Sequence, residues 1–149
     1  MEFGAVMTDS HTEGCGALIY AKNTNRYLFL LRDKSKYAGS WGIVGGKIEA
    51  GETVITGLVR EIKEEIGVDY QKRKFIPLET FTADNRKFIY YTFLVSVDDE
   101  FVPKLNNEHR GYCWVTLDDH PKPLHPGLWR SFNFDIVKQK IKTLESILN

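Results

Sequence analysis

Residues 46–68, with the sequence GKIEAGETVITGLVREIKEEIGV, constrain this chain more than any other segment. They contain an acidic block in which Glu61, Glu64 and Glu65 stand within five positions. Crowded carboxylates are costly unless a cation neutralises them, so the block points to a bound metal ion. The plainer alternative is a solvated helix face paired with Lys63. From ordinary residue usage, chance would match all the fixed positions of the segment on the order of once in 10⁹ start positions.

The spacing predicts a helix over residues 52–66. Glu52 is expected in the first turn, where a carboxylate suits the positive end of the helix dipole. Gly67 follows the last periodic residue and is typical of a glycine that ends a helix. One stripe of this helix is apolar and should face the core: Ile55, Leu58, Val59, Ile62 and Ile66.

The opposite flank of the helix carries Glu61, Glu65 and Gly57, with Glu64 further round. A glycine inside a helix costs about 1 kcal/mol relative to alanine. We therefore expect that something approaches the backbone closely at position 57, either the loop at residues 44–49 or a bound metal.

The fixed residues run Gly, five residues, Glu, seven residues, then Arg-Glu-aliphatic-any-Glu-Glu-any-Gly-aliphatic. This order resembles the Nudix box of the Nudix (MutT-like) hydrolases, and every fixed position is filled. The resemblance implies an α+β fold, an α/β/α sandwich on a mixed β-sheet, with residues 1–149 as a single domain. It also implies Mg²⁺-dependent cleavage of the pyrophosphate bond in a nucleoside diphosphate linked to another group, with Mn²⁺ as an alternative ion. Carboxylate and carbonyl oxygens suit such hard cations, and no His/Cys cluster favours zinc.

Site residues follow from the resemblance position by position. The implied metal ligands on or beside the helix are Glu61, Glu65, Glu64 and the backbone carbonyl of Gly46. The implied catalytic residues are Glu64, Glu61, Arg60 and Glu52. Arg60 is similar to an arginine that orients a catalytic glutamate, and Glu52 is its matching carboxylate. Which glutamate, or loop residue, acts as general base stays open.

Other candidates lie outside the helix. Glu108, in a polar loop six residues before Trp114, is the best distal metal ligand, and His109 beside it is a candidate base or substrate contact. Arg32 and Lys47 are candidates for contact with the substrate phosphates. For Glu108, His109 and Arg32, an ordinary surface role is the alternative.

The substrate class stays open between an ADP-sugar, a dinucleoside polyphosphate and a nucleoside triphosphate. We favour an ADP-containing compound, because such substrates are widespread in the family. Four aromatic residues are candidates either for stacking on a base or for the core: Phe81, Tyr90, Tyr91 and Phe93. The alternative function is a non-catalytic nucleotide-sensing or protein-binding module. The intact glutamate trio favours an enzyme.

The remaining pattern predicts strands at residues 15–22, 26–32, 41–44, 72–82, 86–97 and 112–116. Residues 83–85 should join the fourth and fifth of these strands as a hairpin, and the 86–97 strand should lie centrally in the sheet. Residues 98–110 are expected to form a loop. One final helix is predicted over residues 128–148, with Phe132, Ile136 and Ile141 on its apolar stripe.

The composition of the chain limits the kinds of molecule it can be expected to bind. The 149 residues carry 20 basic and 20 acidic side chains, and this zero net charge argues against a long nucleic acid held by its phosphates. No apolar run reaches the about 18 residues that would suggest a membrane span. Residues 1–12 look irregular and lack a secretory signal, so we expect a cytoplasmic protein, monomeric or homodimeric. Cys15 and Cys113 are expected to be free thiols.

Overall fold

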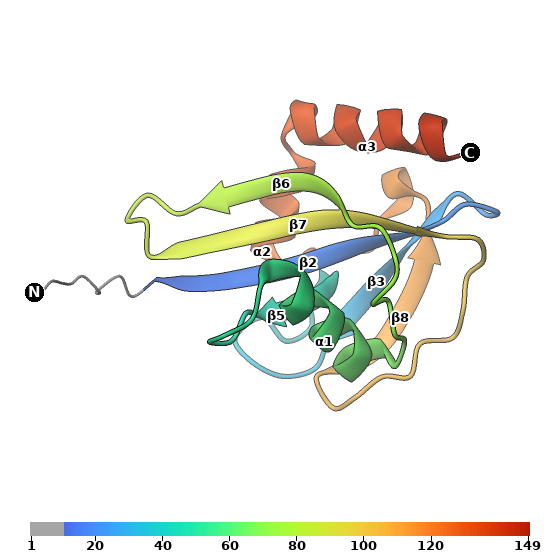
Figure 1. Ribbon diagram of the computed structural model, residues 1–149. Coiled ribbons are helices and arrows are strands. Elements are labelled where there is room, and N and C mark those ends of the chain that lie inside the picture. Colours follow the sequence, from blue (N-terminus) through green and yellow to red (C-terminus); the bar gives the residue numbers. More distant parts are fainter. Residues whose placement is uncertain (1–10) are drawn as a thin grey trace, which may run out of the picture.

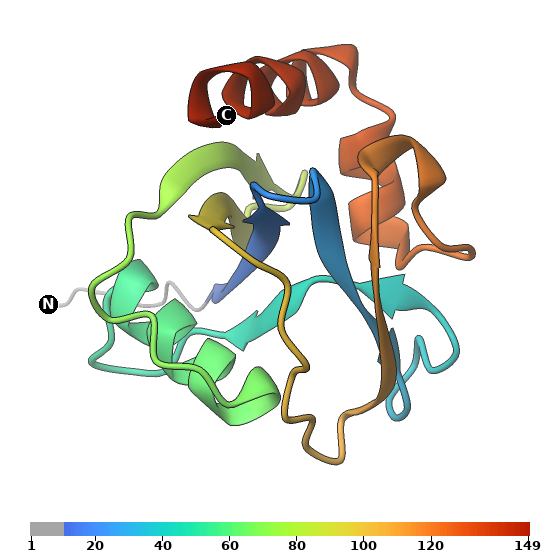
Figure 2. The same cartoon turned by 90° about the vertical axis from the view of Figure 1, so that its right-hand side faces the viewer.

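The computed structural model describes residues 11–149, and the expectations for the irregular N-terminal start fall almost entirely outside this range. One mixed sheet lies between helix α1 (Val54–Ile66) on one face and helices α2 (Pro126–Phe132) and α3 (Asp135–Leu148) on the other (Figures 1 and 2). This arrangement is the predicted α/β/α sandwich. Among the described residues, no helix is long and apolar enough to cross a bilayer.

Within residues 11–149 the sheet contains seven strands, and a short 3₁₀ turn (Leu117–Asp119) follows the last of them. The strands are β2 (Thr12–Ala21), β3 (Arg26–Arg32), β4 (Trp41–Gly42), β5 (Val44–Lys47), β6 (Ile76–Thr82), β7 (Phe88–Val97) and β8 (His109–Val115). The main order is β4-β3-β2-β7-β6, with β5 paired to β2 and β8 paired to β3. Among these seven strands, β2 and β7 pair in parallel and the other pairs are antiparallel.

Each face of the sheet has its own hydrophobic core, because successive side chains of a strand point to opposite faces. In β2, Ala17 and Ile19 pack with Leu58 and Ile62 of α1. The intervening side chains of β2 join Phe132 and Ile141 on the opposite face. The sheet therefore holds α1 and the C-terminal helices on opposite sides.

Strand β3 has the bounds predicted for it, and β7 lies between two strands as expected. The 83–85 hairpin is confirmed, with the Ala83 N–H donating to the Phe88 carbonyl at 2.9 Å. Strand β2 begins three residues before its predicted start. Strand β8 begins at His109, so the predicted loop at 98–110 ends two residues early.

The strand predicted at residues 41–44 is present but is interrupted at Ile43. The segment forms two short strands, and the second continues through Gly45 and Gly46, which lie opposite Gly16 and Cys15 of β2. A side chain at position 45 would collide with the Cys15 carbonyl. Glycine here permits close approach of two backbones, which local sequence does not distinguish from a turn.

The single final helix was wrong. The chain breaks between α2 and α3, where the Asn133 side-chain amide donates to the Trp129 carbonyl at 2.7 Å. Figure 2 shows the two helices running in different directions. The break also shifts the buried stripe, so that Ile136 is 77% exposed while Val137 and Ile141 are buried.

Candidate active site

Helix α1 begins at Val54, not at residue 52. Thr53 caps it, with its hydroxyl accepting from the Thr56 N–H at 3.1 Å while the Thr56 hydroxyl accepts from the Thr53 N–H at 2.9 Å. Threonines at both positions satisfy two backbone donors that would otherwise lack partners, which places the start of the helix. Gly67 ends it in the left-handed conformation, as predicted.

The apolar stripe of α1 differs from the expected one in its first turn. Val54, rather than Ile55, packs against the core with Leu58 and Ile62, and Ile55 is exposed. Because α1 begins at Val54, Glu52 lies outside its first turn, so the predicted interaction of Glu52 with the helix dipole is wrong.

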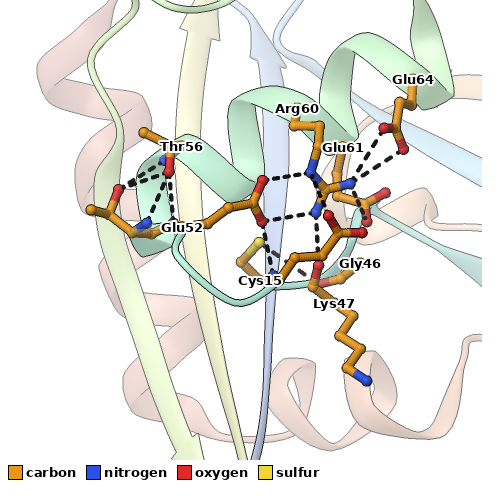
Figure 3. Close-up of polar contacts among 10 residues, drawn as sticks. Cys15, Gly46, Lys47, Glu52, Thr56, Arg60, Glu61 and Glu64 are labelled. Atoms are coloured by element: carbon orange, nitrogen blue, oxygen red, sulfur yellow. Dashed lines mark hydrogen bonds and ion pairs between the residues drawn. The ribbon is translucent and has the colours of Figure 1, made fainter.

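Glu52 instead lies before the helix and pairs with Arg60 (Figure 3). The Arg60 guanidinium donates from Nε to Oε2 at 2.6 Å and from Nη2 to Oε1 at 3.0 Å. These bonds, with a further bond from the Glu49 N–H, lower the pKa of Glu52 to about 2. The two-point contact fixes the loop before α1 to the second turn of the helix.

Arg60 also reaches the acidic block. Its Nη1 lies 3.3 Å from Glu61 Oε2 and 3.3 Å from Glu64 Oε1, and its Nη2 donates to the Lys47 carbonyl at 3.0 Å. Glu64 is the outermost of the three glutamates, with 54% of its side chain exposed against 12% for Glu61. One arginine therefore contacts two predicted catalytic carboxylates and the last residue of strand β5.

Glu61 packs against Gly46. A Cβ on Gly46 would overlap the Glu61 carboxylate, so this glycine creates the space that the carboxylate occupies. Burial raises the pKa of Glu61, with Arg60 acting in the opposite direction. The structure thus brings Glu61 and Gly46 together, as expected for two ligands of one ion.

Glu65 is 2% exposed and accepts a hydrogen bond from the Gly45 N–H at 3.1 Å. Burial raises the pKa of Glu65 to about 9; the bond from Gly45 works against this rise, and the charges of Glu61 and Glu108 add to it. A buried carboxyl with carboxylate neighbours is stabilised in its ionised form by a nearby cation.

The two candidates outside the helix, Glu108 and His109, differ in their exposure. Glu108 is exposed, and its charge raises the pKa of both Glu61 and Glu65, so it belongs to the rim of the acidic cluster. His109 is only 6% exposed, because it opens β8 opposite Arg32. Burial lowers the pKa of His109 to about 4. Its burial rules out the ordinary surface role, and its role as a base or substrate contact stays a prediction, although it does not line the cavity described below.

A cavity of about 450 Å³ lies on the α2 face of the sheet, directly beyond Gly45 and Gly46. The acidic side chains of α1 approach this glycine pair from one side, and the cavity opens on the other. Arg32 lines the cavity, whereas Lys47 is exposed and its side chain points away from the acidic residues (Figure 3). Of the two predicted phosphate contacts, Arg32 therefore lies in the cavity and Lys47 lies outside it.

The four aromatic candidates also divide between the two faces. Phe81 and Tyr90 line the cavity together with Phe88, while Tyr91 and Phe93 pack in the α1 core. Polar residues that the sequence did not single out complete the lining: Glu79, Thr92, His125, Arg130 and Ser131. Nothing in their local sequence marks them, because they come from β6, β7, α2 and the residue that precedes α2.

Comparison with known proteins identifies this arrangement. The family model described as the NUDIX domain matches residues 10–134. The chain belongs to the MutT-like Nudix family. A nucleoside triphosphatase, NudI of Escherichia coli, is 35% identical over 112 residues, covering 66% of this chain and 78% of that protein.

Two solved Nudix structures have the same fold. The MutT Nudix hydrolase from Burkholderia pseudomallei superposes with a TM-score of 0.70 at 26% identity, covering 88% of this chain and 98% of that chain. The MutT protein from Methanosarcina mazei gives 0.67 at 27% identity, covering 92% and 99%. The predicted family, fold and enzyme class are confirmed: this is a Nudix hydrolase.

The Nudix box of this chain fits a hard divalent cation by its donor chemistry. The Glu61 carboxylate contacts Gly46 and the Glu65 carboxyl accepts from the Gly45 N–H, so both acids lie beside the same short backbone segment, whose Gly46 carbonyl is a further oxygen donor. Burial raises the pKa of both carboxyl groups, and an added divalent cation would favour their ionised forms. Within residues 11–149, no three His, Cys, Asp or Glu side chains form a preformed metal cluster. The fit therefore rests on electrostatics and ligand type.

Proposed function

We propose that this Nudix hydrolase cleaves a phosphoanhydride bond of a small nucleotide, and that its substrate class is the nucleoside triphosphates. The observation that carries the proposal is the position of the glycine pair. Gly45 and Gly46 touch buried carboxyl groups on the α1 side and line an aromatic cavity on the other side. A nucleotide in that cavity has its phosphates next to the acidic cluster.

Among the three substrate classes left open by the sequence, the similarity to a nucleoside triphosphatase supports the triphosphates over the ADP-containing compounds that we first favoured. Both remain small nucleotides, which agrees with the zero net charge of the chain. A long nucleic acid stays outside the proposal.

The proposed cofactor is Mg²⁺, with Mn²⁺ as an alternative, held by Glu61, Glu65 and the Gly46 carbonyl. Glu64 and Glu108 are available at the exposed rim of the same cluster. When bound, such a cation neutralises the phosphate oxygens and lowers the pKa of its bound water.

The chain's own groups bind the phosphates and manage the proton. Arg32 lines the cavity, and its buried Nε has no hydrogen-bond partner among the described residues, so it is placed to donate to a phosphate oxygen. Arg60 holds Glu61 and Glu64 at 3.3 Å each and thereby orients both candidates for the general base. Glu52 fixes Arg60 in turn.

The test is hydrolysis of a nucleotide panel in ¹⁸O-water, with Mg²⁺ or with EDTA. The panel should contain nucleoside triphosphates, ADP-sugars and dinucleoside polyphosphates. We expect Mg²⁺-dependent turnover, fastest with a triphosphate, and label on a released phosphate or nucleotide phosphate. Cleavage only of a phosphomonoester or a glycosidic bond, or full activity in EDTA, would refute the proposal.

A further inference from the structure

The cavity follows one row of residues across the sheet. Gly45 lies opposite Gly16, Gly16 lies opposite Thr92, and Thr92 lies opposite Glu79. Neighbouring strands are about 4.8 Å apart, so three spacings place Gly45 and Glu79 about 14 Å from one another. A nucleotide whose phosphates lie at Gly45 therefore extends its base towards Glu79.

A β-bulge directs Glu79 into this cavity. The pairing of β6 with β7 shifts register between Pro77 and Glu79. As a result, Leu78 packs in the core under α3 and the next residue, Glu79, contacts α2 on the same face of the sheet. Regular alternation would place these two side chains on opposite faces, so the irregularity is what brings the carboxylate to the cavity.

Two residues of α2 hold the Glu79 carboxylate. Ser131 Oγ donates to Oε1 at 2.5 Å, and Arg130 Nη2 lies 3.2 Å from both oxygens. The Arg130 guanidinium is in turn stacked on the ring of Phe81, 4.1 Å from its centroid. Glu79 is thus held rigidly while 14% of its side chain stays exposed.

The carboxylate retains hydrogen-bonding capacity. Within the described residues Oε1 accepts two hydrogen bonds and Oε2 accepts one. Each carboxylate oxygen can accept about two. Oε2 can therefore accept a further N–H, such as the ring N–H or exocyclic amine on the edge of a nucleobase, while Phe81 and Phe88 offer apolar ring surface beside it.

We propose that Glu79, positioned by Arg130 and Ser131, accepts a hydrogen bond from the nucleobase and so makes the enzyme select nucleotides over base-free triphosphates. The inference rests on the proposed function and adds the residue that recognises the base. A role of the same contacts as a purely structural tie between β6 and α2 is the alternative that the experiment separates.

The experiment compares kcat/KM for nucleoside triphosphates and for ribose 5-triphosphate, which has no base, in the presence of Mg²⁺. Glu79→Gln should lower kcat/KM about 10- to 100-fold for at least one nucleoside triphosphate, because the amide is uncharged and its NH2 group replaces one carboxylate oxygen with a group that cannot accept, so a hydrogen bond to a charged acceptor is lost. The kcat/KM of this variant for ribose 5-triphosphate should stay within about twofold of the wild-type value. Ser131→Ala keeps Glu79 and removes one of its supports, so it should shift the same ratio in the same direction by less.

Glu100→Gln is the matched control. It removes another carboxylate with two hydrogen bonds from an arginine, Arg26, at 2.6 and 2.8 Å, but at a site that does not line the cavity. Its ratio of kcat/KM for the nucleoside triphosphate to kcat/KM for ribose 5-triphosphate should equal that of wild type. An equal loss on both substrates in Glu79→Gln, or an unchanged ratio in the folded Glu79 and Ser131 variants, would overturn the inference.

A binding measurement keeps the test of base recognition separate from the test of the reaction. Its ligand is a non-hydrolysable phosphonate analogue of the nucleoside triphosphate that wild type cleaves fastest or, if it cleaves none, binds most tightly. If wild type binds the analogue but cleaves no nucleotide, the proposed function fails. Weaker binding by Glu79→Gln would then still support base recognition, and unchanged binding would overturn it.

Discussion

The carboxylate of Glu61 occupies the space beside Gly46 in which the Cβ of any other residue would stand. Helix α1 and strand β5 therefore meet through a side chain on one and bare backbone on the other. A larger residue at position 46 would displace the Glu61 carboxylate, because protein interiors are closely packed.

Gly46→Ala is expected to lower both stability and turnover. The added methyl group displaces the Glu61 carboxylate, which is the end of a flexible side chain, so the cost in stability should lie near the lower end of the about 1–3 kcal/mol for overpacking and the larger loss should be in turnover. Urea unfolding and steady-state kinetics measure the two effects. Gly111→Ala is the control, because a Cβ there meets only Leu31 at an ordinary 3.7 Å. Equal behaviour of the two variants would show that the contact with Glu61 carries no constraint.

Glu65→Gln is expected to keep the fold and lose roughly 10²-fold or more in rate, the scale for a lost metal or charge-stabilising group. The amide oxygen can still accept the bond from Gly45, so the melting temperature without metal should change little. Added Mg²⁺ should raise the melting temperature of wild type and not that of the variant. Near-normal turnover of the variant at saturating Mg²⁺ would remove Glu65 from the site.

Gly57→Leu is expected to impair turnover, although leucine is the better helix former by about 0.5–1 kcal/mol. A Cβ at position 57 lies 3.0 Å from Glu52 Oε1 and 3.5 Å from Ile48, so the side chain pushes on the loop that holds Arg60. A double-mutant cycle with Glu52→Ala measures this contact, since removing Glu52 should relieve part of the cost. A more stable variant with unchanged activity would show that the close approach is unimportant.

His109 should make stability depend on pH. Its pKa is lowered from 6.5 to about 4 by burial, with a smaller contribution from Arg32. As the pH falls below 6.5 the unfolded chain takes up a proton that the native state refuses until about pH 4. Stability is therefore lost over this window, by at most about 3 kcal/mol from this group.

Urea unfolding between pH 7.5 and 5 in EDTA measures that loss. His109→Asn should flatten the dependence on pH, whatever its effect on absolute stability, because asparagine does not titrate. A slope in His109→Asn equal to that of wild type would assign the pH dependence to other groups.

Several predictions from sequence hold because their signals are local. The period of Leu58, Ile62 and Ile66 and the terminal Gly67 define the body and end of α1, and both are seen. The spacing that places Glu61 and Glu65 on one flank follows from the turn of any helix. The resemblance of the box to a known family was confirmed for the same reason, since it depends on residue order alone.

Other predictions failed where two distant segments decide the outcome. Glu52 suits a helix start by itself, but its carboxylate is bound by Arg60 and the helix begins at the threonine cap. His109 lies in a polar stretch, but pairing of β8 with β3 buries it. Lys47 lies inside the box and is exposed outside the cavity, so its contact with the substrate phosphates stays a prediction.

The sequence by itself determined the family, the acidic helix and the hydrolytic chemistry to be expected, because charge spacing and helical period are properties of one short segment. Only the tertiary structure decided what faces the acidic cluster. The row from Gly45 to Glu79 crosses strands far apart in the chain, and a bulge sets which way Glu79 points. Strand register and bulges depend on contacts between partners distant in sequence, which no local pattern encodes.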